Sequence, residues 1–290
     1  MNEPTIVILG ANGSLGRTLT NVLPTATAFT QEQLDITNKT RLYLKLDDCA
    51  PDVIINAAAC TAVDLAEQKE AEAHLVNATA VQYLADWCTA HNKKFIHIST
   101  DYVFDGTKKA GYTEIDVPNP LNAYGRTKLA GENAALSCKN TILIRTSWLY
   151  GSNKSFPAKI LAKATAHEQL RVVNDQYGQP TSAADLAKNI SAMIHAQHIE
   201  PGIYHITNSG VATWYDVAVC TLNFAGITCP ILPIKTNELN LAATRPQYSI
   251  LRSTKTQSLR NWKEALCEYI QQHIEQNIQH QPELGGGKTS

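Results

Sequence analysis

The amino-terminal residues combine a short, buried-type strand with three evenly spaced glycines. The apolar run Thr5–Leu9 ends in the spacing Gly10-x-x-Gly13-x-x-Gly16, and a helical pattern follows from Ser14 to Leu23. Glycines in this arrangement allow a tight turn and let backbone amides approach a pyrophosphate, while the helix N-terminus supplies partial positive charge. A tight turn without a ligand would use the same residues, but the strand–turn–helix context favours a dinucleotide-binding loop.

Strand-like and helix-like segments alternate through the rest of the first half. The further elements expected there are a strand ending near 28–30, strands at 52–56, 94–99 and 141–145, and helices at 67–91 and 122–136. Repeated β-α-β units predict a parallel sheet covered by helices on both faces, with ligands at the carboxyl ends of the strands. We therefore expect an α/β protein with a Rossmann-like, doubly wound parallel sheet.

The pattern loosens after Trp148. The elements expected there are helices at 155–167, 183–195, 214–225 and 262–279, short strands at 170–173 and 203–206, and loops over the proline-rich stretch 229–251. We expect residues 1–150 to form an NADP-binding domain that about 170–206 completes. Residues 207–280, with part of 151–169, are expected to form a small C-terminal substrate-binding lobe. The glycine-containing end 281–290 is expected to be a disordered tail.

Composition excludes several classes of protein. Lys and Arg total 25 and Asp and Glu total 26, with no basic stripe, so neither a nucleic-acid nor a membrane partner is expected. The first apolar run is too short for a signal peptide and no later segment has transmembrane length, so a cytoplasmic location is expected. Seven scattered cysteines without a C-x-x-C pair indicate neither a disulfide framework nor a zinc site.

Tyr124 and Lys128 are the candidate catalytic pair. Their i,i+4 spacing places both on one face of a helix. A free tyrosine has a pKa of about 10, and a nearby ammonium would lower it towards the range useful for proton transfer. Thr100, at the end of a strand, could hydrogen-bond a carbonyl oxygen from the other side. A surface lysine beside a half-buried tyrosine would give the same spacing, but the dinucleotide loop and Thr100 favour proton delivery to a carbonyl.

The adenosine end of the cofactor is less well defined. A carboxylate about 20 residues beyond the glycines usually selects NAD by bonding the ribose 2′-hydroxyl. The second strand here ends at Thr30, without an acid, and Arg17 directly follows the third glycine. Arg17 could meet a 2′-phosphate, although a solvated helix arginine is nearly as consistent with the sequence. The pattern therefore indicates NADPH, or use of both NADPH and NADH.

The sequence resembles the extended short-chain dehydrogenases/reductases that modify nucleotide sugars, and among them the dTDP-4-dehydrorhamnose reductase family. The matching stretches are 10–16, 56–64 with Glu67, 99–106, 120–128 with Gly131 and Glu132, 145–150, 175–181, and Arg245-Pro246. They extend over almost the whole chain, so their combination is far more specific than any single motif.

This resemblance implies the reduction by NADPH of the C4 keto group of dTDP-4-dehydro-6-deoxy-L-lyxo-hexose to dTDP-L-rhamnose, in polysaccharide biosynthesis. It implies Tyr124 as proton donor, Lys128 as its electrostatic partner and Thr100 as a residue that tunes the tyrosine. The cofactor contacts that it implies are Gly10, Gly13, Ser14, Leu15, Gly16, Asp35, Ile36, Ala57, Ala58, Ala59, Ser99, Tyr124 and Lys128. The substrate contacts that it implies are Thr100, Asp101, Trp148 and Arg245.

Three implied roles have plain structural alternatives. Trp148 could be a core tryptophan, and Arg245 a surface arginine before a proline. Asn77 lies where related reductases keep a helix-bending asparagine that supports a proton relay, but it could equally be a polar helix residue. A homodimer is a further possibility for this chain. Some family members use a metal at a subunit interface, so the resemblance also allows Mg²⁺, yet no set of metal ligands can be identified in this sequence.

Other functions remain open at this point. A dehydratase would carry an Asp-Glu pair after Thr100, whereas Asp101 is followed by Tyr102, which counts against dehydration. A 4-epimerase, or a reductase of another NDP-4-keto-6-deoxyhexose, needs the same tyrosine and lysine. A non-catalytic regulatory subunit of the methionine adenosyltransferase type is disfavoured by the intact Thr100, Tyr124 and Lys128. The sequence identifies neither the sugar, nor its C4 stereochemistry, nor the pathway.

Overall fold

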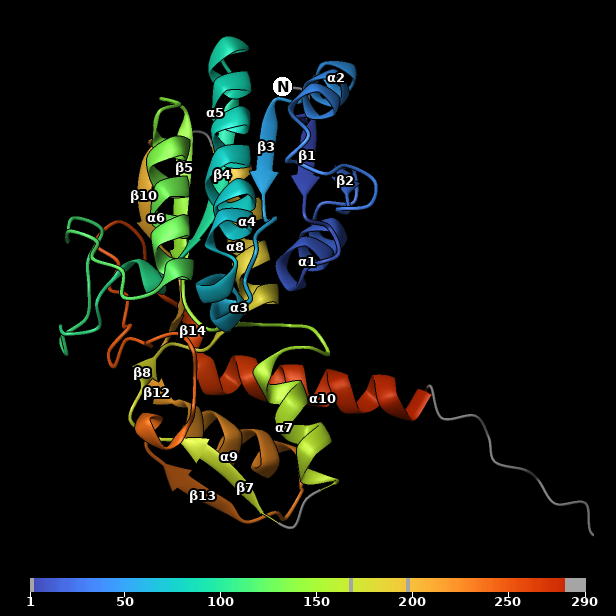
Figure 1. Cartoon of the computed structure of the whole chain (residues 1–290). Coiled ribbons are helices and arrows are strands. Elements are labelled where there is room, and N and C mark those ends of the chain that lie inside the picture. The colour runs from blue at the N-terminus through green and yellow to red at the C-terminus, as the bar shows by residue number, and fades with distance from the viewer. Residues whose placement is uncertain (1–2, 167–168, 197–198, 280–290) are drawn as a thin grey trace, which may run out of the picture.

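The computed structural model describes residues 3–166, 169–196 and 199–279 (Figure 1). Its centre is a six-stranded sheet in the order β10-β5-β4-β3-β1-β2, in which every neighbouring pair is parallel. The strands are β1 (Ile6–Leu9), β2 (Thr27–Phe29), β3 (Val53–Asn56), β4 (Lys94–Thr100), β5 (Thr141–Thr146) and β10 (Gly202–His205). The inner strands are continuous apolar runs because both of their faces are covered.

Helices cover the two faces of this sheet. On one face, α1 (Ser14–Val22) packs beside α8 (Ala183–His195), and their leucines and isoleucines share one core with the sheet. The other face is covered by α2 (Lys39–Cys49), α5 (Ala80–Ala90) and α6 (Ala123–Leu136). The predicted Rossmann-like, doubly wound parallel sheet is confirmed.

The long helix expected over 67–91 is wrong in one respect. The segment forms α3 (Val63–Gln68), α4 (Glu70–His74), a π-helical turn η1 (Leu75–Thr79) and α5. Lys69, with a φ of −130°, separates α3 from α4. A π turn inserts an extra residue and rotates the buried face. Leu75, at the start of this turn, is exposed although a regular amphipathic helix over 67–91 would place it on the apolar face with Ala78 and Val81.

The C-terminal lobe is built around a second, smaller sheet. β7 (Leu170–Val173) pairs in parallel with β13 (Ile231–Ile234), and the helices α7 (Phe156–Ala164), α9 (Trp214–Ala225) and α10 (Trp262–Gln279) pack in the same apolar core. The strand expected at 170–173 therefore does not complete the main sheet, whereas β10 does. The loops expected over 229–251 contain β13, which tolerates Pro233 because it lies at a sheet edge.

Short elements connect the sheet half to the lobe. They are β6 (Leu149–Tyr150), β8 (Tyr177–Gly178), β9 (Thr181–Ser182), β11 (Asn208–Ser209), β12 (Ala212–Thr213), β14 (Leu259–Asn261) and the 3₁₀ turns η2 (Asp101–Val103) and η3 (Thr236–Glu238). Within the described ranges, no helix combines the length and the apolar character needed to cross a bilayer. The tail expected at 281–290 lies outside the described residues.

Candidate active site

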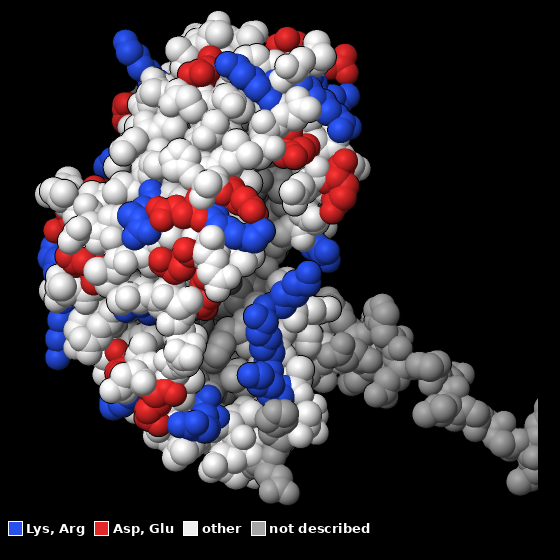
Figure 2. Space-filling model, viewed as in Figure 1, with Lys and Arg blue, Asp and Glu red and all other residues white. Residues whose placement is uncertain are grey.

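Two adjoining cavities lie along the carboxyl ends of the sheet strands. The first, of about 330 Å³, is on the β2 side, and the second, of about 450 Å³, lies between the sheet half and the lobe. Gly13, Ala57 and Ala59 line both of them. Figure 2 shows acidic and basic side chains interspersed on the sheet half, with a short row of Lys and Arg on the lobe. Because the two cavities share Gly13, Ala57 and Ala59, an elongated ligand can extend from one into the other across the glycine loop.

The glycine loop is shaped by two close approaches of backbone. Gly10 has a φ of +83°, and a Cβ there would lie 2.6 Å from the Ala58 amide nitrogen, where β1 and β3 end side by side. A Cβ on Gly16 would lie 2.1 Å from the Gly10 carbonyl oxygen, so only glycine lets α1 start this close to β1. The N-terminus of α1 then faces the two cavities, and a helix N-terminus that faces open space in this way can bind an anion.

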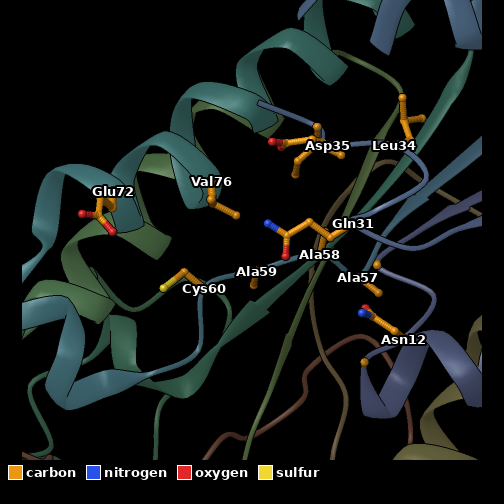
Figure 3. A pocket seen from close by; sticks show the side chains of 13 residues that line it. Asn12, Gln31, Leu34, Asp35, Ala57, Ala58, Ala59, Cys60, Glu72 and Val76 are labelled. Carbon is orange, nitrogen blue, oxygen red and sulfur yellow. The ribbon is translucent and has the colours of Figure 1, made fainter. Parts of the chain in front are cut away.

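The β2-side cavity is lined mainly by small and apolar residues, with two carboxylates, Asp35 and Glu72. Asp35, Ile36 and 57–59, all expected to contact the cofactor, line it. Gln31, labelled in Figure 3, also lines this cavity, and the sequence did not predict it there. No Lys or Arg is among its described lining residues. Arg17, which the sequence offered for a 2′-phosphate, is exposed, and its Nε donates to the Asn12 carbonyl 3.0 Å away.

The second cavity brings the three expected catalytic residues together. Thr100 ends β4, Tyr124 lies in the first turn of α6, and Lys128 follows one turn later; all three line the cavity. The Asn122 side chain caps α6 by accepting from the Gly125 amide at 2.7 Å. Lys128 Nζ donates to the Ile98 carbonyl at 2.7 Å, which ties the helix to β4. Tyr102 packs edge-on against Tyr124.

Burial dominates the electrostatics of the tyrosine and the lysine. Burial raises the pKa of Tyr124 well above its ordinary value, and the hydrogen bond with Thr100 opposes this. Burial also lowers the pKa of Lys128 to about 8, against the attraction of Glu132. The pKa of Tyr124 is therefore raised rather than lowered as the sequence suggested, because desolvation is the largest influence on it.

Asp101 is buried beneath Thr100. Its carboxylate accepts from Thr100 Oγ1 at 3.0 Å and from Ser147 Oγ at 3.1 Å. Burial raises the pKa of Asp101 to about 6, although its hydroxyl partners, including Ser249, oppose the shift. Asp101 lines the cavity, but its side chain is already bonded to protein hydroxyls, so it holds Thr100 as well as facing a ligand.

Two tryptophans form the lobe side of the same cavity. Trp148 and Trp214 stack with their rings parallel and 3.7 Å apart. Trp148 has a φ of +47° and its indole fills the space above Gly178, where a Cβ would collide with it. The sequence predicted Trp148 but missed Trp214. The only available sequence signal was an aromatic residue at the start of a helix.

Arg245 does not line this cavity. It lies in a separate hollow with Lys235 and Thr236, and its guanidinium pairs with both carboxylate oxygens of Asp64. The ion pair lowers the pKa of Asp64 to about 2. Asp64 also accepts from the Ala243 amide at 3.0 Å. Arg245, which the resemblance implies as a substrate contact, is therefore held by Asp64 and joins the lobe to the sheet half.

Asn77 bends its helix, within the π turn η1. Its amide oxygen accepts from the Cys60 amide at 2.8 Å, and its amide nitrogen donates to the Cys60 carbonyl and to Thr127 Oγ1. A Cβ on Gly131 would lie 2.0 Å from the Asn77 carbonyl oxygen, so α6 packs directly on the bend. Asn77 therefore fixes the loop after β3 against α6.

These features fit a nicotinamide dinucleotide. The backbone approach at Gly10 and Gly16 leaves room for a pyrophosphate at the start of α1, and the two cavities extend from it in opposite directions. A dinucleotide bound in this way would have its nicotinamide near Ser99, Tyr124 and Lys128 and its adenosine near Asp35. Among the described residues there is no group of three or more His, Cys, Asp or Glu side chains arranged to hold a metal ion.

Comparison with known proteins identifies the family. Residues 4–274 match the family model described as RmlD substrate binding domain. The chain belongs to this family. A spore coat polysaccharide biosynthesis protein, SpsK, of Bacillus subtilis is 36% identical over 277 residues, covering 92% of this chain and 97% of that protein. The dTDP-4-dehydrorhamnose reductase of Aggregatibacter actinomycetemcomitans is 37% identical over 283 residues, covering 90% and 96%.

Solved structures of the RmlD family have the same fold. A dTDP-4-dehydrorhamnose reductase from Bacillus anthracis in complex with NADP superposes with a TM-score of 0.90 at 33% identity, covering 93% of this chain and all of that one. An orthologue from Clostridium acetobutylicum gives a TM-score of 0.88 at 37% identity, covering 93% and 99%.

Proposed function

We propose that this protein reduces the C4 keto group of dTDP-4-dehydro-6-deoxy-L-lyxo-hexose to give dTDP-L-rhamnose, with NADPH as reductant. The observation that carries the proposal is the convergence of Thr100, Tyr124 and Lys128 in one cavity that adjoins a dinucleotide-binding loop. Relatives that match nearly the whole chain are named as reductases of this sugar, and one was solved with NADP.

Each side chain then has a defined task. The bound dinucleotide supplies a hydride to the carbonyl carbon. Tyr124 donates its proton to the carbonyl oxygen, since a neutral phenol is the state that burial favours. Thr100 would turn its one hydroxyl proton from Asp101 to the same oxygen as negative charge develops there. Lys128 holds the ribose hydroxyls and stabilises the phenolate that Tyr124 becomes.

The stacked Trp148 and Trp214 would cover one face of the sugar and exclude water from the reacting carbonyl. Arg245 would reach the diphosphate only after exchanging its bonds to Asp64. The enzyme would work in the cytoplasm, because its nucleotide-sugar substrate and its reductant are cytoplasmic metabolites.

A 4-epimerase is the second candidate, because it needs the same Tyr124 and Lys128. A specific observation disfavours it relative to the reductase. The stacked Trp148 and Trp214 narrow the lobe side of the cavity, whereas an epimerase has to turn its keto-sugar over within the site.

The test is NADPH oxidation followed by absorbance, with dTDP-4-dehydro-6-deoxy-L-lyxo-hexose generated in situ, and with NADH in parallel. Consumption of one NADPH per sugar and appearance of a dTDP-6-deoxyhexose support the proposal. Interconversion of dTDP-hexoses without net NADPH consumption would instead establish the epimerase. Tight NADPH binding without turnover of any keto-sugar would point to a non-catalytic binding subunit.

A further inference from the structure

A buried ion pair joins α6 to the central sheet. Glu132 and Arg145 form a two-point pair, with Arg145 Nε 2.9 Å from Oε1 and Nη2 2.7 Å from Oε2, and both side chains are at most 2% exposed. Ser99 Oγ donates to the same Oε1 at 2.5 Å. Ser99 and Arg145 are register partners in β4 and β5, so one carboxylate bridges two neighbouring strands.

Stability alone does not explain this pair. Taking two charges out of water is costly, and well-packed apolar residues often stabilise a core equally well. The ion pair also makes further contacts: Arg145 lies over the Phe104 ring, 5.0 Å from its centre, and Nη1 is 3.4 Å from His205 Nε2. The charges are therefore held in one fixed arrangement between α6 and the sheet.

The position of Glu132 relative to Lys128 suggests what the charge does. Glu132 follows Lys128 by four residues on α6, so the two side chains leave neighbouring turns of the same helix face. Lys128 Nζ is bonded to the Ile98 carbonyl, and Ser99, the next residue of β4, is bonded to Glu132. A lysine buried to 2% exposure without a direct carboxylate contact needs a nearby negative charge to stay protonated.

We propose that Glu132 is a positioning residue for the reduction: clamped by Arg145 and Ser99, its carboxylate keeps the Lys128 ammonium charged where it meets the cofactor ribose and Tyr124. Arg145 sets the strength of this effect, because it partly neutralises the carboxylate. The inference rests on the proposed function for the role of Lys128. It adds a residue pair that touches neither cofactor nor substrate.

The other ionisable groups around Lys128 do not replace Glu132. Tyr124 on the same helix stays neutral because burial raises its pKa. His97 faces Lys128 from β4 and stays neutral, since burial and the lysine charge lower its pKa. The charge of Asp101 acts on Tyr124, whereas the carboxylate that acts on Lys128 is Glu132. Arg145 is the one cation that contacts Glu132 among the described residues.

The experiment measures kcat/KM for the keto-sugar and, separately, NADPH binding by fluorescence, both from pH 6 to 10. In wild type, activity and NADPH affinity should fall as pH rises through about 8, because the ammonium is lost. In Glu132→Gln the fall should move to lower pH by about one unit, and in Arg145→Gln to higher pH. Opposite shifts are a signature that loss of structure cannot produce.

Asp185→Asn is the matched control, because Asp185 is also a buried carboxylate paired with an arginine, Arg260, but lies in α8 away from Lys128. It should leave the pH profile where it is. Each single variant at the Glu132–Arg145 pair leaves a buried charge without its partner, so the double variant E132Q/R145Q provides a neutral pair that should fold. Its profile should still move to lower pH, because Glu132 is the nearer charge.

Unmoved profiles in the folded double variant, or shifts in the same direction in both single variants, would overturn the inference. Failure of the proposed function would look different. NADPH would bind with the expected pH dependence in all variants, but no keto-sugar would be reduced.

Discussion

The sheet half and the C-terminal lobe both line the cavity that contains Thr100, Tyr124 and Lys128, but they hold their side chains differently. In the sheet half, Thr100 and Lys128 are buried and bonded to Asp101 and to the Ile98 carbonyl. The lobe side of the cavity is the Trp148–Trp214 ring stack, and outside the cavity Arg245 ties the lobe to the sheet-half carboxylate of Asp64, which is 44% exposed. We infer that the parallel sheet fixes the geometry of proton transfer, whereas the lobe recognises the rest of the substrate through contacts that a ligand can rearrange.

The largest expected effect comes from the sheet half. Tyr124→Phe removes the proton donor while keeping the ring that packs against Tyr102, so kcat should fall by about 10²- to 10⁴-fold. Stopped-flow or steady-state NADPH absorbance measures the loss, and NADPH binding should be nearly unchanged.

Tyr102→Phe is the matched control, because Tyr102 lines the same cavity and loses the same hydroxyl. It should retain most of the activity. Equal losses in the two variants would show that a general polarity of the cavity, rather than Tyr124, delivers the proton.

The second prediction concerns Asp101, the buried carboxyl that holds Thr100. Its pKa is raised from 3.8 to about 6, so the folded protein binds a proton that the unfolded chain releases between these values. Wild-type stability attributable to Asp101 should therefore fall as pH rises from 3.8 to 6, by on the order of 3 kcal/mol. Urea unfolding of wild type and Asp101→Asn at several pH values measures the difference.

The variant should lack this dependence, so its stability relative to wild type should rise across that pH range. A constant difference between the two curves from pH 4 to 6 would mean that Asp101 stays ionised when buried.

The contrast between the two regions also explains what the sequence revealed. Gly10–Gly16, Thr100 and the Tyr124–Lys128 pair are local patterns at the ends of strands and on one helix. Parallel-sheet topology brings such positions to one edge whatever the details of packing. The fold class and the grouping of these residues were therefore predictable.

The remaining features depend on contacts between distant segments. Trp214 stacks on a residue 66 positions earlier, and Asp64 pairs with Arg245 across 181 positions. No local spacing marks either contact. β7 was assigned to the wrong sheet because a four-residue apolar strand carries no information about its partner. The raised pKa of Tyr124 was missed because burial, unlike spacing, depends on the assembled fold.

The third prediction tests the lobe side of the cavity. Trp214→Ala removes one ring of the Trp148 stack, and aromatic pairs of this kind contribute about 0.5–1.5 kcal/mol beyond the area that they bury. KM for the keto-sugar should rise about two- to tenfold, with a smaller change in kcat.

Trp214→Phe keeps an aromatic face and should recover most of the affinity. If Trp214→Ala instead lowers kcat as strongly as Tyr124→Phe, the lobe fixes the reaction geometry and the proposed division between the two regions is wrong.

The smallest effect is expected where the two regions are joined. Asp64→Asn breaks the pair with Arg245, and because Asp64 is partly exposed the free energy of unfolding at pH 7 should fall by only about 0.2–1 kcal/mol. The pKa of Asp64 is lowered to about 2, so the pair stabilises the protein above pH 3.8 and this contribution disappears as pH falls towards 2. Urea unfolding curves for the two proteins should converge over that range.

The Glu70–Arg126 pair provides the control, because its carboxylate is as exposed as that of Asp64 and it joins α4 to α6 within the sheet half. Glu70→Gln should leave KM unchanged. Asp64→Asn should lower KM, since Arg245 no longer has to exchange its bonds to Asp64 before it reaches the diphosphate. If both variants lower stability alike and neither changes KM, the Asp64–Arg245 pair is an ordinary surface ion pair, and the lobe is held over the cavity by its tryptophans and apolar core instead.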